Sequence, residues 1–223
     1  MPLLKTPVPI LEAHLRFPDP RQSQPDGLVA IGGDLSVPRL LLAYRMGIFP
    51  WTVDPLTWWS PDPRGIFELE QFHVSRSLAR AVRKAIFHTT MDQAFRRVME
   101  GCAAPVHGRR STWITADFLE AYSRLHLEGH AHSIEAWEGD QLAGGIYGVA
   151  IGGFFAGESM FHRTSDASKV ALFHLVEHLK RRGFVLFDIQ MLTPITAQLG
   201  GTTISRTQYL KRLATAVEKP CSF

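Results

Sequence analysis

A long stretch without charged side chains, residues 141–157, limits the possible folds more than any other feature of the sequence. It contains six glycines, which weaken helices, and it is too short to cross a bilayer comfortably as a helix. Turn-forming residues occur at 138–140, just before it, and at 151–152 within it. The pattern predicts an antiparallel meander of three strands, at residues 131–137, 142–150 and 153–158.

Further helices and strands are expected on both sides of this meander. Helices are predicted at residues 75–86, 92–100, 116–128 and 167–182, where apolar residues recur at helical spacing between capping residues and glycine. Strands are predicted at residues 87–89, 184–190 and 202–205, a short helix at 194–199 and a last helix from Thr207. The class is therefore α/β (α+β), and the order of elements resembles that of the N-acyltransferase (GNAT-like) fold.

The first 66 residues have a different character. Prolines recur from Pro18 to Pro63, where they remove backbone donors and favour turns. One helix is expected between Ser36, a suitable N-cap, and Gly47, a suitable end. We therefore expect a small, loop-rich N-terminal domain at residues 1–66 and an acyltransferase-like domain at residues 67–223.

The composition excludes several classes of protein. Apolar residues make up 45% of the chain and charged residues 20%, which is typical of a globular protein and not of a disordered or fibrous one. The 24 Lys and Arg residues against 21 Asp and Glu give a net charge of only +3, so any nucleic-acid binding must come from local clusters of charge. Two cysteines, Cys102 and Cys221, and an N-terminus without the apolar core of a secretory signal fit a cytoplasmic location.

Polar side chains interrupt one otherwise apolar strand, residues 184–190. Strand alternation places Leu186, Asp188 and Gln190 on one face. Glu158, at the end of the third strand of the meander, would lie across from Asp188 if the two strands are neighbours. These groups form either a hydrogen-bonded polar strand end or a site in which Asp188 accepts a proton or holds an ammonium group, aligned by Gln190.

A stripe of positive charge runs along the predicted helix at residues 75–86. Arg76, Arg80, Arg83 and Lys84 share one side of it, opposite the apolar residues, and none has an acidic partner on the helix. The stripe is either an ordinary solvated face or a contact surface for nucleic-acid phosphates.

Histidines and tryptophans offer weaker signals. His174, Glu177 and His178 match the H-x-x-E-H pattern of some zinc peptidases, but they lie on the polar side of their helix, so a solvated face is the favoured interpretation and no metal is expected. Trp51 and Trp113, each beside prolines or turns, are either core residues or stacking platforms for an unpaired base.

Several short segments follow one another along nearly the whole chain. They are residues 32–35 (Gly-Gly-Asp-Leu), 47–51 (Gly-Ile-Phe-Pro-Trp), 58–64 (Trp-Trp-Ser-Pro-Asp-Pro-Arg), 113–115 (Trp-Ile-Thr), 129–135 (Gly-His-Ala-His-Ser-Ile-Glu), 157–161 (Gly-Glu-Ser-Met-Phe), 167–169 (Ala-Ser-Lys) and 188–190 (Asp-Ile-Gln). In this order they resemble the bacterial leucyl/phenylalanyl-tRNA–protein transferase family.

The resemblance implies a reaction. Leu, Phe or, less readily, Met would move from aminoacyl-tRNA to the N-terminal Arg or Lys of an acceptor protein, which marks that protein for degradation by the N-degron pathway. The nucleophile is an α-amine with a pKa of roughly 7.7–8.0, so it needs only modest help to lose its proton. Asp188 would accept that proton or position the amine, and Gln190 would orient it. Glu158 would hold the acceptor's cationic side chain or bridge both of the acceptor's cations.

The resemblance also implies the binding residues. Trp51 and Trp113 would hold the 3′-terminal adenosine of the tRNA. The transferred side chain would occupy a pocket formed by Ile146, Phe155, Met160, Leu172 and Leu175. No cofactor and no membrane partner is implied, and a monomer is expected.

Two other classes of protein stay open at this point. An acyl-CoA-dependent N-acetyltransferase would cradle pyrophosphate with a glycine-rich loop before the helix at 167–182, but residues 158–169 contain no glycine. A non-catalytic RNA-binding protein would need the positive stripe but not Asp188, Gln190 and Glu158.

Overall fold

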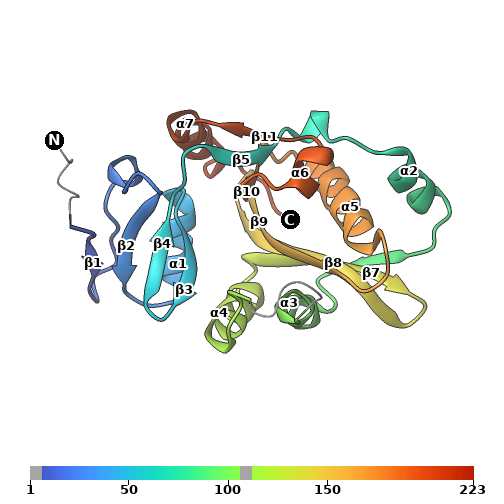
Figure 1. The fold of residues 1–223 in the computed structure, drawn as a ribbon, viewed down its shortest axis with the longest axis horizontal. Helices are drawn as coiled ribbons and strands as arrows, with labels where there is room; N and C mark the ends of the chain where they lie inside the picture. Colours follow the sequence, from blue (N-terminus) through green and yellow to red (C-terminus); the bar gives the residue numbers. More distant parts are fainter. Residues whose placement is uncertain (1–6, 106–111) are drawn as a thin grey trace.

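The computed structural model describes residues 7–105 and 112–223, which form two sheets with helices around them (Figure 1). The larger sheet has seven strands in the order β11-β5-β10-β9-β8-β7-β6, and the smaller has four in the order β1-β2-β4-β3. The mixed α/β class predicted from the sequence is confirmed. Within the two described ranges, no helix is long and apolar enough to cross a membrane.

The large sheet contains the predicted meander at its centre. All its neighbouring strands are antiparallel except β9 and β10, which run parallel. The strands are β5 (Arg64–Phe67), β6 (His88–Met91), β7 (Ala131–Glu138), β8 (Gln141–Ile151), β9 (Phe154–His162), β10 (Leu186–Gln190) and β11 (Gly201–Ile204). In this sheet β10 is an interior strand and β11 lies at the edge.

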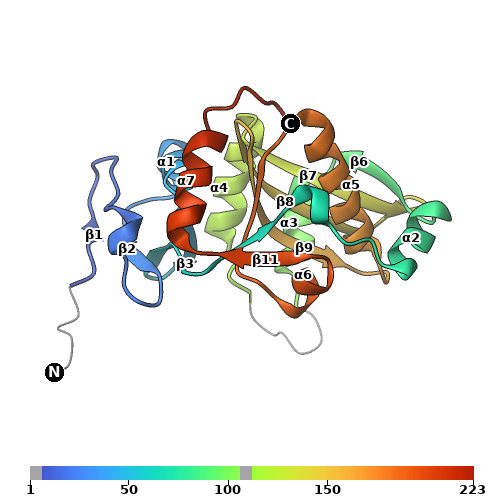
Figure 2. The same ribbon diagram turned by 90° about the horizontal axis from the view of Figure 1, so that it is seen from above.

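Helices cover both faces of the large sheet (Figures 1 and 2). On one face lie α3 (Phe95–Ala103) and α4 (Ala116–Leu127), which pack on the meander. On the other lies α5 (Ala167–Arg182), with α2 (Arg76–Arg83) beside it. The chain ends with α6 (Pro194–Gln198) and α7 (Arg206–Ala216). The helix predicted at 167–182 is confirmed at both ends, and the one predicted at 92–100 begins three residues later.

The N-terminal part is more regular than the loop-rich region expected from the sequence. Its small sheet is formed by β1 (Ile10–Leu11), β2 (Leu28–Gly32), β3 (Phe49–Val53) and β4 (Leu56–Trp59), with α1 (Val37–Arg45) packed beside them and one 3-10 turn at Pro20–Gln22. The difference arises because proline does not always mark a turn. Pro50 lies within β3, an edge strand, where a missing N–H donor is tolerated.

The expected boundary between residues 66 and 67 falls inside β5. This strand belongs to the large sheet, between β10 and β11. One continuous apolar core contains Tyr44 and Trp58 from the small-sheet region together with Phe118 and Tyr147 from the large-sheet region. The two regions are therefore joined by both a strand and a core.

Candidate active site

A pocket of about 510 Å³ lies where the small-sheet region meets the large sheet. One wall comes from β3 and from Trp113, and the others from β5, β8, β9, β10 and α5, with α6 at the rim. Its lining is mainly apolar and includes Phe49, Phe67, Phe187 and Ile189. Because so many separate elements line it, the pocket exists only in the completed fold.

Five of the seven binding residues named from the sequence line this pocket. They are Trp51, Trp113, Ile146, Met160 and Leu172. The other two, Phe155 and Leu175, are buried in the core below α5 and do not line it. Phe155 packs edge-on against Phe187, which does line the pocket, at a ring distance of 5.5 Å.

The pocket's carboxylate comes from a bulge in β9. Tyr147 of β8 lies opposite Ser159 and Gly148 opposite Gly157, so Glu158 is the extra residue between them. The bulge needs glycine on the partner strand, because a Cβ at Gly148 would collide with a backbone oxygen of β9. Bulges of this kind turn a side chain out of the regular alternation. Here the result is that Glu158 points into the site.

A second bulge, in β10, places the amide. Asp188 lies opposite Ile66 and Gln190 opposite Gly65, so Ile189 is the extra residue. Gln190 has a φ of 54°, in the left-handed region that favours glycine. Its backbone N–H donates to Asp188 Oδ1 at 2.8 Å, which stabilises the bend. The Gln190 side chain then donates from Nε2 to Glu158 Oε1 at 2.9 Å.

Asp188 lies behind the pocket and not in it. Its side chain is fully buried, and Arg64 donates to both oxygens, at 2.8 Å from Nε and 2.6 Å from Nη2. The Tyr209 hydroxyl donates to Oδ2 at 2.9 Å. Together with the Gln190 N–H, these donors occupy both carboxylate oxygens. The geometry therefore ties Asp188 to the backbone of β10, and Asp188 is not one of the residues that line the pocket.

Glu158 has the opposite surroundings. It lines the pocket and accepts hydrogen bonds from the Tyr44 hydroxyl at 2.8 Å and the Tyr122 hydroxyl at 3.4 Å. Removal from bulk water raises the pKa of Glu158 to about 8, against the opposing effect of the Tyr44 hydrogen bond. The negative charge of Asp188 acts in the same direction as the burial. Near neutral pH, Glu158 is thus poised between its acid and its base form.

Three of the four cations named from the sequence lie on α2 and the fourth, Lys84, is its C-cap, away from the small sheet (Figure 1). Arg76, Arg80, Arg83 and Lys84 are all exposed. None of them forms an ion pair with any residue in 7–105 or 112–223. Ser75 caps the helix, its hydroxyl accepting from the Leu78 N–H at 3.3 Å. The stripe is an exposed positive surface on a well-formed helix.

The histidines of α5 do not gather into a site. In the part of the chain that the structure describes, no group of three or more His, Cys, Asp or Glu could hold a metal ion. His178 packs its ring against Phe223 at 4.5 Å, and His174 is half-buried, so this face is less solvated than expected.

Sequence reasoning missed the partners of the two carboxylates. Arg64, Tyr44, Tyr122 and Tyr209 come from four separate elements and meet only in the fold. One signal was present: Arg64 stands directly before the apolar Gly65-Ile66-Phe67, and a buried cation in a strand needs a carboxylate.

An apolar pocket that ends on a carboxylate and an amide suits a ligand with an apolar group at one end and an amine at the other. This combination fits an enzyme that transfers a group to an amine. The sequence-family model for leucyl/phenylalanyl-tRNA protein transferase matches residues 66–214, and the family model for the N-terminal domain of that transferase matches residues 33–62. The chain belongs to the leucyl/phenylalanyl-tRNA–protein transferase family, and it is an aminoacyltransferase.

Curated relatives support this assignment over most of the chain. The leucyl/phenylalanyl-tRNA–protein transferase of Shewanella sp. (strain W3-18-1) is 51% identical over 201 residues, 88% of this chain and 85% of that protein. That of Anaeromyxobacter sp. (strain Fw109-5) is 50% identical over 213 residues, 94% and 91% of the two chains. Among solved structures, L-PGS from Bacillus licheniformis is similar at a TM-score of 0.41 and 14% identity over 72% of this chain and 54% of that chain, which is too distant to define the fold.

Proposed function

We propose that this chain transfers Leu, Phe or, less readily, Met from aminoacyl-tRNA to the N-terminal Arg or Lys of acceptor proteins. It would do so as a cytoplasmic monomer and mark its acceptors for the N-degron pathway. The observation that carries the proposal is the mainly apolar pocket that Glu158 and Gln190 also line, hydrogen-bonded to each other. We also propose that the large sheet is GNAT-like, because its helices and strands follow one another in the predicted order. Among the described strands of this sheet, β9 and β10 are the one parallel pair.

The apolar part of the pocket is proposed to hold the transferred side chain. Ile146, Met160 and Leu172 line it between β8, β9 and α5. Long side chains without branching at Cβ, as in Leu, Phe and Met, suit such a pocket. Val and Ile are stiff and wide at Cβ, so they should be disfavoured.

The two tryptophans are proposed to hold the terminal adenosine. Trp51 and Trp113 both line the pocket and are half-buried, and each is held edge-on by a second ring, Trp59 at 5.4 Å and Phe118 at 5.1 Å. A braced aromatic ring with one accessible side is a stacking platform for a base.

Glu158 is proposed to take the proton of the acceptor amine. The neutral amine nitrogen attacks the ester carbonyl carbon and gives up a proton to Glu158. Glu158 then passes this proton to the 3′-oxygen of the adenosine as the bond between that oxygen and the carbonyl carbon breaks, so the 3′-oxygen leaves as a hydroxyl. A general base works best when its pKa lies near the pH of the reaction. The pKa of about 8 for Glu158 matches an α-ammonium at roughly 7.7–8.0.

Gln190 and Asp188 then have supporting roles. Gln190 donates to Glu158 and is proposed to align the amine beside it. Asp188, occupied by Arg64 and Tyr209, is proposed to be a positioning residue that fixes the left-handed backbone of Gln190. This differs from the sequence-based expectation, in which Asp188 itself met the amine.

The exposed stripe on α2 is proposed to contact the tRNA backbone. It supplies Arg76, Arg80, Arg83 and Lys84 without ion-pair partners among the described residues, and exposed unpaired cations bind phosphate by releasing counterions.

The direct test is incubation with labelled Leu-tRNA and a peptide that begins with Arg. Label on the peptide is expected, with much less from Val-tRNA and none when labelled acetyl-CoA is the donor. Transfer from acetyl-CoA at a comparable rate would contradict the proposal and favour an N-acetyltransferase.

A further inference from the structure

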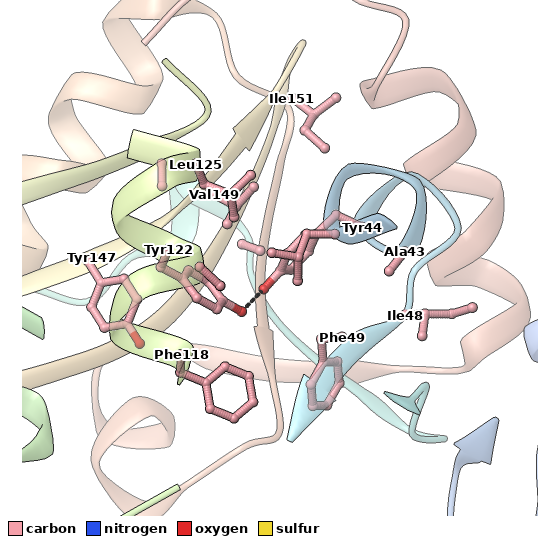
Figure 3. Close-up of a cluster of buried hydrophobic side chains, with 14 of the residues drawn as sticks. Ala43, Tyr44, Ile48, Phe49, Phe118, Tyr122, Leu125, Tyr147, Val149 and Ile151 are labelled. Atoms are coloured by element: carbon pink, nitrogen blue, oxygen red, sulfur yellow. Dashed lines mark hydrogen bonds between the residues drawn. The ribbon is translucent and has the colours of Figure 1, made fainter. Parts of the chain in front are cut away.

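Two buried tyrosines meet at Glu158 from opposite sides of the core. Tyr44 belongs to α1 in the small-sheet region and Tyr122 to α4 on the large sheet. Their hydroxyls are hydrogen-bonded to each other, as the dashed line in Figure 3 marks. Both rings are fully buried, with exposures of 1% and 0%. Neither residue lines the pocket, so they reach a substrate only through Glu158.

Both tyrosine hydroxyls lie within hydrogen-bond distance of this carboxylate. Burial and the negative charge of Glu158 raise the pKa of Tyr44 and of Tyr122 well above the ordinary value, so both keep their protons. Tyr44 and Gln190 donate to Oε1, at 2.8 and 2.9 Å, and the Tyr122 hydroxyl lies 3.4 Å from Oε2. Each phenol has a single proton, so Tyr122 donates either to the Tyr44 hydroxyl or to Glu158, and in both cases the pair of hydroxyls holds the carboxylate together with Gln190.

A third tyrosine shows that burial in this core does not by itself bring a tyrosine hydroxyl to Glu158. Tyr147 on β8 is also fully buried, and its ring packs edge-on against that of Tyr122 at 5.8 Å. Its hydroxyl, however, has no hydrogen-bond partner among the described residues. Figure 3 shows all three rings in the same cluster. Only the two hydroxyls that meet each other also reach Glu158.

We propose that Tyr44 and Tyr122 are positioning residues for the transfer reaction, which hold the bulged Glu158 side chain so that its carboxylate faces both Gln190 and the bound amine. The proposal rests on the role of Glu158 proposed above. It also gives the small-sheet region a part in the chemistry, because Tyr44 is supplied by α1.

The hydrogen bonds have a defined effect on protonation. The charged or titratable groups facing Glu158 are Tyr44 from α1, Tyr122 from α4, Arg64 from β5, Tyr147 from β8, Asp188 from β10 and Tyr209 from α7. Donors to a carboxylate favour its ionised form. Loss of a tyrosine hydroxyl therefore leaves Glu158 protonated to a higher pH, and the proton acceptor is lost at neutral pH.

The test compares Tyr44→Phe and Tyr122→Phe with wild type in single-turnover transfer from Leu-tRNA to an Arg peptide, as a function of pH. Tyr44→Phe should lower the rate near pH 7 by about tenfold and move the midpoint of the pH–rate curve upward by about one unit. Tyr122→Phe should act in the same direction but less, because its bond to the carboxylate is longer. Binding of tRNA should stay at the wild-type level.

Tyr147→Phe is the matched control. It removes a hydroxyl from the same core but no hydrogen bond, so its rate and its pH midpoint should equal those of wild type. An equal loss in Tyr147→Phe and Tyr44→Phe would overturn the proposal, because the effect would then be a general one of the core. An unchanged midpoint in both Tyr44→Phe and Tyr122→Phe would overturn it as well.

A double-mutant cycle separates this proposal from the one about Glu158. In a Glu158→Gln background, Tyr44→Phe should no longer shift the pH midpoint, because no carboxylate remains to titrate. If Glu158→Gln alone transfers Leu at the wild-type rate, the proposed role of Glu158 fails. If Glu158→Gln is impaired and Tyr44→Phe still shifts the midpoint in that background, the tyrosine proposal alone fails.

Discussion

At the scale of single residues, two carboxylates on neighbouring strands differ in their hydrogen-bond partners and therefore in their protonation. Asp188 is fully buried and held by a guanidinium, a phenol and a backbone N–H. Among the described residues, Glu158 accepts hydrogen bonds only from neutral donors, and its pKa rises to about 8. When two carboxyl groups have such different surroundings, one stays a fixed charge and the other can exchange a proton near neutral pH.

The first prediction concerns the pH dependence of stability that Glu158 imposes. Its folded-state pKa of about 8 exceeds the ordinary 4.5, so its stabilising contribution is fully present below 4.5 and is lost as the pH rises through 8. As the pH rises from 4.5 to about 8, the free energy of unfolding of Glu158→Gln should therefore increase relative to that of wild type by up to about 1.4 kcal/mol per pH unit. Urea unfolding at several pH values measures this, with the exposed Glu218→Gln as a control that shows no such trend. A constant difference would contradict the raised pKa.

The second prediction concerns the buried pair of Arg64 and Asp188. Asp188→Asn leaves the Arg64 guanidinium without a counter-charge inside the core, which should cost about 3–5 kcal/mol in the free energy of unfolding. Asp166→Asn is the control, because Asp166 pairs with Lys169 near the surface, where an ion pair contributes about 0–1 kcal/mol. Chemical denaturation compares the two. Equal, small losses would mean that the buried pair does not stabilise the fold.

These residues also show where sequence reasoning reaches its limit. Trp51, Trp113 and Met160 could be assigned to the pocket because each stands in a segment that resembles the family. The burial of Asp188 could not be predicted, because it depends on Arg64, which lies 124 residues earlier in the chain. Contacts of that kind are fixed by tertiary packing and leave no local periodicity in the sequence.

At the scale of elements, helices were easier to predict than strands. The signals for α5 are local: a periodic apolar face and Gly183 in the left-handed conformation at its end. The meander was also predictable, because tight turns join its strands. By contrast, the partners of β5 within the described residues are β10 and β11, which follow much later in the chain. Its four residues are too few to show a strand alternation, and Arg64 before an apolar run is their one signal.

The third prediction belongs to helix α2. Neutralising Arg76, Arg80, Arg83 and Lys84 together should weaken tRNA binding and flatten its dependence on salt. The log–log slope should fall by about 0.7–0.9 for each phosphate that the variant no longer neutralises. Transfer from a minimal aminoacyl-adenosine donor should survive, since that donor has no tRNA body.

The control for α2 changes exposed cations elsewhere. Arg181 on α5 and Lys211 on α7 are also exposed, and their joint neutralisation should leave the salt slope unchanged. The same slope for the α2 variant and wild type would identify the stripe as an ordinary solvated face.

At the scale of the whole molecule, the small-sheet region and the large sheet depend on each other. Arg64 Nη1 donates to the Gly47 carbonyl at 3.0 Å, and Arg206 Nη1 donates from α7 to the Ser60 carbonyl at 2.8 Å. The apolar core is continuous between the two regions, and the pocket takes its walls from both. Neither region encloses its own core, so neither is expected to be stable alone.

The last prediction follows from this shared core: the whole chain should unfold in one cooperative transition. Three of the five tryptophans, Trp51, Trp58 and Trp59, lie in the small-sheet region. A Trp113→Phe/Trp137→Phe variant therefore reports that region by fluorescence, while far-UV circular dichroism reports mainly the helices on the large sheet. Unfolding of the small-sheet region would break the hydrogen bond between Tyr44 and Glu158 and expose the apolar residues that the two regions share. The fluorescence and circular dichroism signals should therefore have the same urea midpoint. Midpoints that differ beyond experimental error would show two independent folding units joined at β5.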